Sequence, residues 1–270
     1  MQQPEHSIEN FLKPTEFCDY THPDIQTIVR KFKQGSDNQK ELALKIFYFV
    51  RDSIHYSVGN WNKKASHTLK QKHGTCTNSA NLFVALARAC KIPAGYGVLD
   101  VVGPEYFGPI ILPHFSKVIS KKSKHVYVHV FLEEKWIKVD PSDDEPLSIN
   151  TEHLNPQSRL VDWNGINDAV LNLNPTHIIK DSGPLTSIDH ILKKKQRKYL
   201  YIPVYLANLY IQFLRTNGKT ITKHSDLYPS FIVWLRKNRF FSYFLAIFFF
   251  TFVSGRIRWQ QKFYNVLSVR

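Results

Sequence analysis

The chain has 270 residues, 43% of them hydrophobic, and a formal net charge of +14. This composition is typical of a folded globular protein and excludes a disordered chain. Residues 1–185 hold 21 Lys and Arg against 20 Asp and Glu, whereas residues 186–270 hold 15 against 2. We therefore predict a domain over residues 1–185 and a basic tail over residues 186–270, and a tail of this charge favours contact with an anionic surface.

The cysteine count indicates a reducing compartment. Cys18, Cys76 and Cys90 are too few and too scattered for a disulfide framework. The first twelve residues contain neither a basic segment nor an apolar segment of the kind found in signal peptides. We expect a cytoplasmic chain, or one that faces the cytosol from a membrane surface.

Two helices are predicted before the first informative motif. They cover residues 24–34 and 37–53, and the second has Ser36 or Asp37 as its cap. Its apolar residues follow the helical period: Leu42, Ile46, Phe49, Val50 and Ile54. Residues 55–73 have no clear period and are predicted to form a loop.

A buried helix is predicted to begin at Cys76. Thr75 is a suitable N-cap, and Ile92-Pro93 ends the helical pattern because proline restricts the residue before it. One apolar face recurs at steps of three and four: Ala80, Phe83, Val84, Ala87 and Cys90. Cys76 then lies in the first turn, where unpaired N–H groups and the helix dipole favour the thiolate. This is a suitable place for a nucleophilic cysteine.

The next segments are a strand and two irregular stretches. Residues 95–102 are predicted to form a strand between glycines and a proline. Residues 103–124 contain three prolines and are predicted to form a long loop, such as a lid over a site. Residues 143–185 have little periodicity and are predicted to wrap around the domain.

An antiparallel hairpin is predicted over residues 125–142. Val126, Val128, Val130 and Leu132 alternate with His125, Tyr127, His129 and Phe131, and a second strand continues the pattern through Ile137 and Val139. If Glu133-Glu134 form a two-residue turn, Tyr127 is opposite Asp140 and His125 is diagonal to it on the same face. The imidazole and the carboxylate are then within reach of one another.

These residues suffice for acyl-transfer chemistry. A thiol at a helix start, a histidine and an aspartate form a set of nucleophile, base and orienting group. The Cys76 N–H is also a candidate donor to an oxyanion. We therefore predict Cys76, His125 and Asp140 as the catalytic residues.

Two motifs resemble those of transglutaminase-like proteins. The Cys helix is similar to the family pattern G-x-C-x-x-x-A-x-L-x-x-A-L-x-R-A-x-G-I-P-A, and residues 125–142 are similar to H-x-W-x-E-x-x-L-x-G-x-W-x-x-x-D-P. The correspondence falls on Cys76, His125 and Asp140, with Trp136 and Pro141 in register. The resemblance implies an α+β fold, a papain-like core in which the Cys helix packs on an antiparallel sheet, with the helical tail as an appendage. It also implies a Cys-His-Asp triad that transfers an acyl group through a thioester to water or to an amine, without a cofactor.

Five positions depart from the family pattern. His129 stands in place of Glu, Tyr127 in place of Trp, Glu133-Glu134 in place of Asp-Gly, and Lys91 in place of Gly. None of them is a triad position. The expected substrate is a protein, a peptide or an acyl thioester. Two alternatives stay open: an amide-bond-forming homologue in natural-product assembly, and a non-catalytic scaffold recruited by its tail.

A zinc site is the rival chemistry. His73 and Cys76 are separated by two residues, and His125 and His129 by three, as in some ligand pairs. Four residues along a strand span roughly 13 Å, so His125 and His129 cannot chelate one ion. We therefore predict no metal.

The tail combines basic clusters with aromatic runs. A cluster of Lys and Arg at residues 193–198 precedes an apolar run at 199–214, and a second apolar run covers residues 239–256. That last run has 14 mostly apolar residues between Arg239 and Ser254, fewer than the roughly 20 needed to span a bilayer. It is typical of an interfacial helix on an anionic membrane. Nucleic acid is not an expected partner, since the charges are separated by long apolar stretches.

Overall fold

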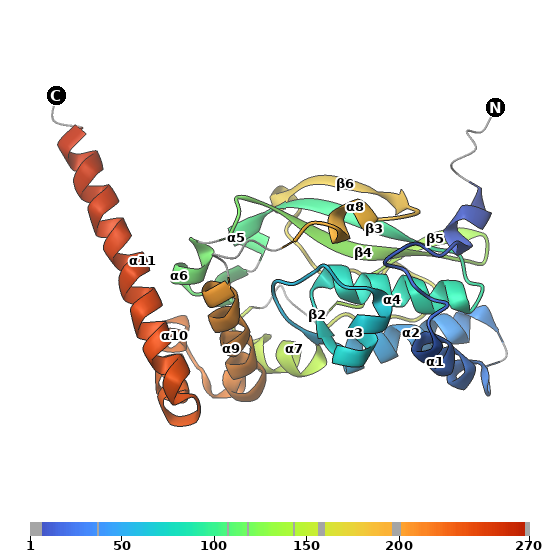
Figure 1. The fold of residues 1–270 in the computed structure, drawn as a ribbon, viewed down its shortest axis with the longest axis horizontal. Helices are drawn as coiled ribbons and strands as arrows, with labels where there is room; N and C mark the ends of the chain where they lie inside the picture. Colours follow the sequence, from blue (N-terminus) through green and yellow to red (C-terminus); the bar gives the residue numbers. More distant parts are fainter. Residues whose placement is uncertain are drawn as a thin grey trace.

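The structure is a computed structural model in which an antiparallel sheet carries helices on one face (Figure 1). It describes the backbone of residues 7–36, 38–106, 108–117, 119–142, 144–155, 160–195 and 201–267, and side chains as far as residue 253. The α+β class and the helix-on-sheet core predicted from the sequence are confirmed.

The main sheet has four strands in the order β5-β4-β3-β6, all antiparallel to their neighbours. Its strands are β3 (Ala94–Val102), β4 (Lys122–Leu132), β5 (Lys135–Val139) and β6 (Ile178–Leu185). Two short strands, β1 (His55–Tyr56) and β2 (His73–Gly74), pair in parallel just before the Cys helix. The pairing of β1 with β2 fixes the approach of the chain to Cys76.

Longer helices alternate with short helical turns. The helices are α1 (Pro23–Lys33), α2 (Gln39–Ser53), α3 (Ala65–Gln71), α4 (Cys76–Ala89), α5 (Gly103–Tyr106), α6 (Pro113–Ser116), α7 (Glu145–Thr151), α8 (Asp189–Leu192), α9 (Tyr201–Asn217), α10 (Leu227–Asn238) and α11 (Phe240–Leu267). The 3-10 turns are η2 (Ile8–Leu12), η3 (Gly108–Ile110), η4 (Pro175–His177), η6 (Gly218–Thr220) and η7 (His224–Asp226).

Helix α4 is the centre of the core. It packs on β3 and β4 on one side and on α1, α2 and α3 on the other. Every side chain from Cys76 to Arg88 is buried, so burial extends all round the helix instead of one face. At its end Lys91 has φ of 62°, and the Ile92 N–H donates to the Ala87 carbonyl over 2.9 Å. Lys91 therefore adopts the left-handed conformation in which glycine usually ends a helix.

The predicted hairpin register is confirmed. Leu132 pairs with Lys135 and Val128 with Val139, so Glu133-Glu134 form the two-residue turn. Both glutamates have positive φ, 48° and 64°, which is the backbone of a type I′ turn. The right-handed twist of the two strands selects this turn although its residues are not Asn-Gly. Asp140 consequently follows β5 at the level predicted beside His125.

Two sequence predictions before β3 need correction. Residues 55–73 are not a loop throughout, because they contain β1, α3 and the start of β2. The α3 pattern was hidden because two of its buried residues, Ser66 and Thr68, are polar. The cap of α2 is Asn38, whose side chain accepts from the Glu41 N–H over 2.9 Å. Of the two predicted caps, Ser36 is not the cap, and Asp37 lies outside the described residues.

Two other stretches contain more structure than predicted. Residues 103–124 hold α5, η3 and α6, and β4 begins at Lys122, three residues before the predicted start. The 143–185 stretch holds α7 and ends in β6, which pairs with β3 at the sheet edge. The sequence did not predict β6 because this strand is polar and has no fully buried residue.

The tail helices α9, α10 and α11 pack together around a second apolar cluster beside the sheet domain (Figure 1). This cluster also includes Leu112, Phe115 and Leu154 from the first part of the chain. The apolar run predicted over 239–256 lies within α11, whereas residues 196–198 of the basic cluster are outside the described part of the chain. Within the described residues, no helix combines the length and the apolarity that crossing a bilayer requires.

Candidate functional site

Cys76 is the first residue of α4, and its side chain is only 6% exposed. The turn before it is fixed by Asn78, whose Oδ1 accepts from both the N–H and the Oγ1 of Thr75 over 3.0 Å. The Asn78 amide in turn donates to the Trp61 carbonyl over 2.8 Å. Thr75 is therefore the N-cap, as the sequence predicted, and the sulfur is held at the end of α4 where N–H groups lack partners within the helix.

His125 and Asp140 form a buried pair at the edge of the hairpin. The imidazole Nε2 lies 2.5 Å from Oδ2 of Asp140, and each side chain is 1% exposed. The other carboxylate oxygen accepts from Ser142, from its N–H over 3.1 Å and from its hydroxyl over 2.6 Å. Both oxygens of Asp140 are thus engaged, which fixes the carboxylate and the ring that it holds.

The remaining ring nitrogen of His125 faces two groups. The side chains of His125 and Cys76 lie close enough for each to shift the pKa of the other. Because Nε2 is bonded to Asp140, Nδ1 is the nitrogen available to the sulfur. The Tyr106 hydroxyl, from the end of α5, lies 2.9 Å from the same Nδ1. Cys76 and Tyr106 therefore share one nitrogen of the imidazole.

The charges at this site favour a thiolate and an imidazolium. Burial alone would raise the pKa of the Cys76 thiol, but the charge and hydrogen bond of His125, together with the Val126 N–H, hold this pKa below its usual value. Burial also opposes the charged form of His125, yet Asp140 and Cys76 outweigh it and raise the pKa of His125. Each partner stabilises the charge of the other, as in activated cysteine nucleophiles.

Tyr56 forms one wall beside the triad. Burial, and the negative charges of Cys76 and Asp140, raise the pKa of its phenol well above the usual range. Tyr56 also lines a cavity of about 150 Å³ together with Tyr106, Ser142 and Leu147. Tyr106 connects the cavity to the triad by a hydrogen bond to His125, and Ser142 does so by a hydrogen bond to Asp140. Tyr56 is connected through the charges of Cys76 and Asp140. The cavity therefore lies beside residues that contact His125 and Asp140.

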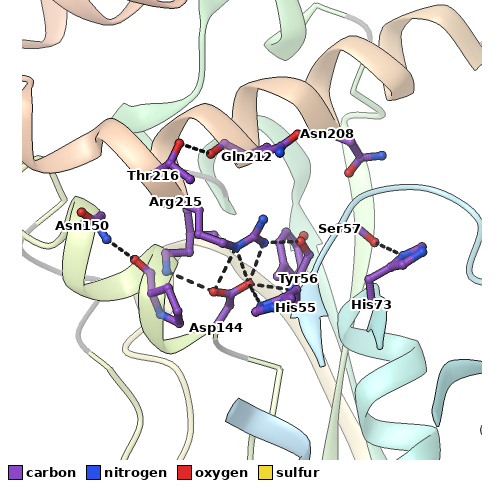
Figure 2. Close-up of polar contacts among 12 residues, drawn as sticks. His55, Tyr56, Ser57, His73, Asp144, Asn150, Asn208, Gln212, Arg215 and Thr216 are labelled. Atoms are coloured by element: carbon purple, nitrogen blue, oxygen red, sulfur yellow. Dashed lines mark hydrogen bonds and ion pairs between the residues drawn. The ribbon is translucent and has the colours of Figure 1, made fainter. Parts of the chain in front are cut away.

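The backbone of Tyr56 is held by an ion pair between the domain and the tail (Figure 2). The Tyr56 N–H donates to Oδ2 of Asp144 over 2.9 Å, and its carbonyl accepts from Nη2 of Arg215 over 2.9 Å. Arg215, on α9, contacts the same Oδ2 through Nε at 2.9 Å and Nη2 at 2.6 Å. The side chain of Asp144 is fully buried and that of Arg215 is 17% exposed. These contacts hold α9 against Tyr56, the residue beside Cys76.

The other cysteines have the opposite electrostatics. Cys18 is fully buried, and burial raises its pKa to about 11. Cys90 is 5% exposed, and burial raises its pKa despite the charge of Lys33. Only Cys76 among the three cysteines has a lowered pKa.

His129 belongs to a different polar group on the same face of the sheet. Its Nε2 lies 3.2 Å from the Tyr127 hydroxyl, which donates to Asp181 over 2.7 Å. Burial, with the charge of Lys138, lowers the pKa of His129 to about 4, so the ring is neutral at neutral pH. His129 is therefore a polar residue near the site that contacts Tyr127 and not the triad.

Sequence reasoning missed Tyr106, Tyr56 and Ser142. Ser142 had a detectable signal, because a serine two residues after an aspartate often donates to that carboxylate. Tyr56 and Tyr106 had none: Tyr56 lies in a two-residue strand, and Tyr106 lies in the aperiodic 103–124 stretch.

Comparisons with known proteins identify a related family. Residues 26–141 match the transglutaminase core of the transglutaminase-like superfamily. No curated relative matches the chain. Among solved structures, it is similar to a candidate cysteine protease from Cytophaga hutchinsonii, with 23% identity, a TM-score of 0.40, and coverage of 50% of this chain and 42% of that one. It is also similar to a candidate protease from Parabacteroides distasonis, with 14% identity, a TM-score of 0.31, and coverage of 50% and 28%. The match spans less than half the length of either solved protein.

Proposed function

We propose that this chain, whose residues 26–141 match the transglutaminase core, is a cysteine acyltransferase or hydrolase. It acts on an amide or thioester carbonyl through a thioester on Cys76. The observation that carries the proposal is the buried His125–Asp140 pair beside Cys76, with the pKa of the thiol lowered and that of the imidazole raised. A merely structural cysteine at this degree of burial has a raised pKa, as Cys18 does.

The acylation step needs only these three groups. The Cys76 thiolate attacks the carbonyl carbon of a donor R–CO–X, and the N–H at the start of α4 is a donor to the oxyanion that forms. The bond to X breaks, and X leaves as HX with the proton from Nδ1 of His125. Asp140 accepts from Nε2 throughout and stabilises the imidazolium. The products are R–CO–S–Cys76 and a neutral imidazole.

The second step restores the ion pair. Water or an amine attacks the thioester carbonyl, and His125 removes a proton from the attacking group. The carbon–sulfur bond breaks, and the thiolate leaves beside the newly formed imidazolium. Water gives a carboxylic acid and makes the protein a peptidase or amidase. An amine gives an amide and makes it a transferase, the chemistry that amide-bond formation from a carrier-bound thioester also requires.

Intact-mass analysis tests the proposal. The full chain is incubated with an acyl donor, with and without a labelled primary amine, and both the protein and the small products are weighed. We expect an acyl adduct on wild-type protein that Cys76→Ala lacks and that His125→Asn forms more slowly. The labelled amide identifies transfer, and free acid alone identifies hydrolysis. Equal adduct formation by wild type and Cys76→Ala would contradict the proposal and favour the scaffold alternative.

We also propose that the tail binds an anionic membrane surface. Supporting this, α11 exposes a series of phenylalanines: Phe240, Phe241, Phe244, Phe248 and Phe252. Exposed basic residues, Arg236, Lys237 and Arg239, lie at the start of this helix. Apolar side chains beside cations are typical of interfacial helices.

Vesicle sedimentation of the full chain tests the membrane proposal. We expect binding to vesicles of phosphatidylcholine with phosphatidylserine that weakens with added salt and is lost in Phe244→Ser/Phe248→Ser. Val233→Ser, an exposed apolar position on α10, is the matched control. If the protein sediments equally without vesicles, or does not bind vesicles at low salt, the membrane is not a partner.

A further inference from the structure

A second cavity lies between α9 and the segment that precedes β4. Its volume is about 210 Å³, and its wall is almost entirely apolar. The wall includes Ile111, Phe115 and Ile119 from the segment before β4 and Val204, Ala207 and Ile211 from α9. An empty space with this lining suits an apolar ligand group, because it offers dispersion contacts and few hydrogen-bond partners.

This apolar cavity adjoins the cavity beside the triad. Tyr56, Ile110 and Leu147 line both spaces, so the two share one wall. Tyr56 is also the residue whose phenol is affected by the charges of Cys76 and Asp140. Tyr56 therefore lies beside both the triad and the apolar cavity, and an acyl group on Cys76 that extends past this residue would enter the cavity.

Helix α9 is held in place on the domain side of the cavity. Besides the contacts of Arg215, the Asn208 side chain accepts from the Val58 N–H over 2.9 Å and donates to the Val58 carbonyl over 3.1 Å. Figure 2 shows Asn208 and Arg215 projecting from α9 toward the strand that carries Tyr56. Both contacts are made to main-chain groups of residues 56 and 58. The cavity thus lies against a helix that is held through main-chain groups one residue either side of Ser57.

We propose that this cavity binds the hydrocarbon chain of the acyl donor, so that the preferred R group is an unbranched acyl chain of about eight carbons. The inference rests on the proposed function, because it concerns the group that becomes attached to Cys76. An apolar cavity of about 150 Å³ holds a six-carbon benzene molecule. The volume here is larger, at about 210 Å³, and corresponds to about eight carbons.

The chemistry at the carbonyl is unchanged. The thiolate of Cys76 attacks octanoyl–X, the bond to X breaks, X leaves with the proton from His125, and the octanoyl group remains on the sulfur as a thioester. The seven carbons beyond the carbonyl then occupy the space lined by Ile111 and Ile211. Burial of that chain makes the transition state for octanoyl transfer more favourable than the one for acetyl transfer.

A series of p-nitrophenyl esters tests the inference on the full chain. The second-order rate of Cys76 acylation is measured by nitrophenolate release and intact mass, with acetate, butanoate, hexanoate, octanoate, decanoate and N-acetyl-phenylalanine esters. We expect the rate to rise at least about tenfold from acetate to octanoate and to fall again at decanoate. Cys76→Ala supplies the background rate for each ester.

Paired variants locate the chain in the cavity. Ile211→Trp fills the space, and Ile202→Trp makes the same change at an exposed position of α9. We expect Ile211→Trp to lower the octanoate rate to near the acetate rate while leaving acetate unchanged, and Ile202→Trp to alter neither. Ala207→Leu is the smaller substitution if Ile211→Trp does not fold. Free fatty acids on wild-type protein supply a second measurement, with octanoate expected to slow Cys76 alkylation most.

The outcomes separate this inference from the proposed function. If acetate and octanoate acylate Cys76 equally, or if Ile211→Trp lowers both rates alike, the acyl-chain inference is wrong and the proposed function stands. A stronger preference for the phenylalanine ester would also overturn it, because the occupant would be an amino-acid side chain. If no ester reacts with Cys76 above the Cys76→Ala background, the proposed function fails.

Discussion

The hydroxyl of Tyr106 lies 2.9 Å from Nδ1 of His125, on the ring nitrogen that also serves Cys76. The two rings are 5.3 Å apart between centroids, and Tyr106 borders the cavity beside the triad. Tyr106 therefore competes with the thiolate for one imidazole proton. As a positioning residue it sets how strongly His125 is coupled to Cys76.

Replacing Tyr106 by Phe removes this competition and keeps the ring. We expect Nδ1–H to be donated to the sulfur alone, which stabilises the thiolate by about one hydrogen bond and lowers the pKa of Cys76 by about half a unit to one unit. The acid limb of the Cys76 alkylation profile should move to lower pH by that amount. Tyr127→Phe is the matched control, since the Tyr127 hydroxyl donates to Asp181. A shift of the limb to higher pH would show that Tyr106 supports the ion pair instead.

The ion pair between Arg215 and Asp144 is expected to stabilise the fold strongly. Arg215→Met keeps the apolar stem but leaves the buried Asp144 carboxylate without its cation, a change that typically costs about 3–5 kcal/mol. Urea unfolding measures the free energy of unfolding, and Arg236→Met at an exposed position of α10 is the control. A loss below about 0.5 kcal/mol would mean that α9 does not depend on this contact.

The same variant also tests whether α9 affects the site. Because Arg215 donates to the carbonyl of Tyr56, Arg215→Met should loosen the wall beside Cys76. We expect slower acylation of Cys76 under conditions where circular dichroism shows the variant fully folded. An unchanged acylation rate in the folded variant would show that the tail does not affect the reaction at Cys76.

The hairpin turn offers a stabilising substitution. Glu133 and Glu134 both have positive φ, where residues with a Cβ are strained and Asn-Gly is preferred. We expect Glu133→Asn/Glu134→Gly to raise the free energy of unfolding by about 1 kcal/mol. The reversed pair, Glu133→Gly/Glu134→Asn, has the same composition and should gain less. If both pairs raise the free energy of unfolding equally, the increase comes from removing the two negative charges and not from turn geometry.

The pairing of His125 with Asp140 was predictable because it depends on the local pattern of one hairpin. The alternation from Val126 to Leu132 and its continuation through Ile137 leave one turn that keeps the aliphatic residues on a single face. That register brings Asp140 beside His125. The cap at Thr75 and the proline at position 93 similarly delimit the helix that begins at Cys76.

The contacts of the tail were not predictable, because they join residues far apart in the sequence. Arg215 and Asp144 are separated by 71 positions, and Arg215 is one of fifteen cations in residues 186–270. No periodicity distinguishes it from the solvated ones. Tyr106 escaped prediction for the same reason, since its partner comes from β4 and its own stretch has no regular pattern. In α3 the difficulty was different: Ser66 and Thr68 are buried polar residues, so hydrophobic periodicity fails there.

The central claim is that Cys76 is a thiolate paired with a His125 imidazolium, and the pH dependence of alkylation tests it most directly. The full chain is treated with iodoacetamide from pH 4 to pH 10, and peptide masses assign the modification to Cys18, Cys76 or Cys90. The lowered pKa of Cys76 and the raised pKa of His125 predict fast alkylation of Cys76 already near pH 6.

The sign of the pH dependence is fixed by these shifts. Alkylation of Cys76 should slow only on the acid side, where the thiolate is protonated, and Cys18 and Cys90 should stay unmodified because burial raises their pKa values. His125→Asn should remove the fast reaction near pH 6, whereas His129→Asn should keep it. Alkylation of Cys76 that begins only above about pH 8, as for a free thiol, and that is equal in wild type and His125→Asn, would contradict the ion pair and with it the proposed enzyme.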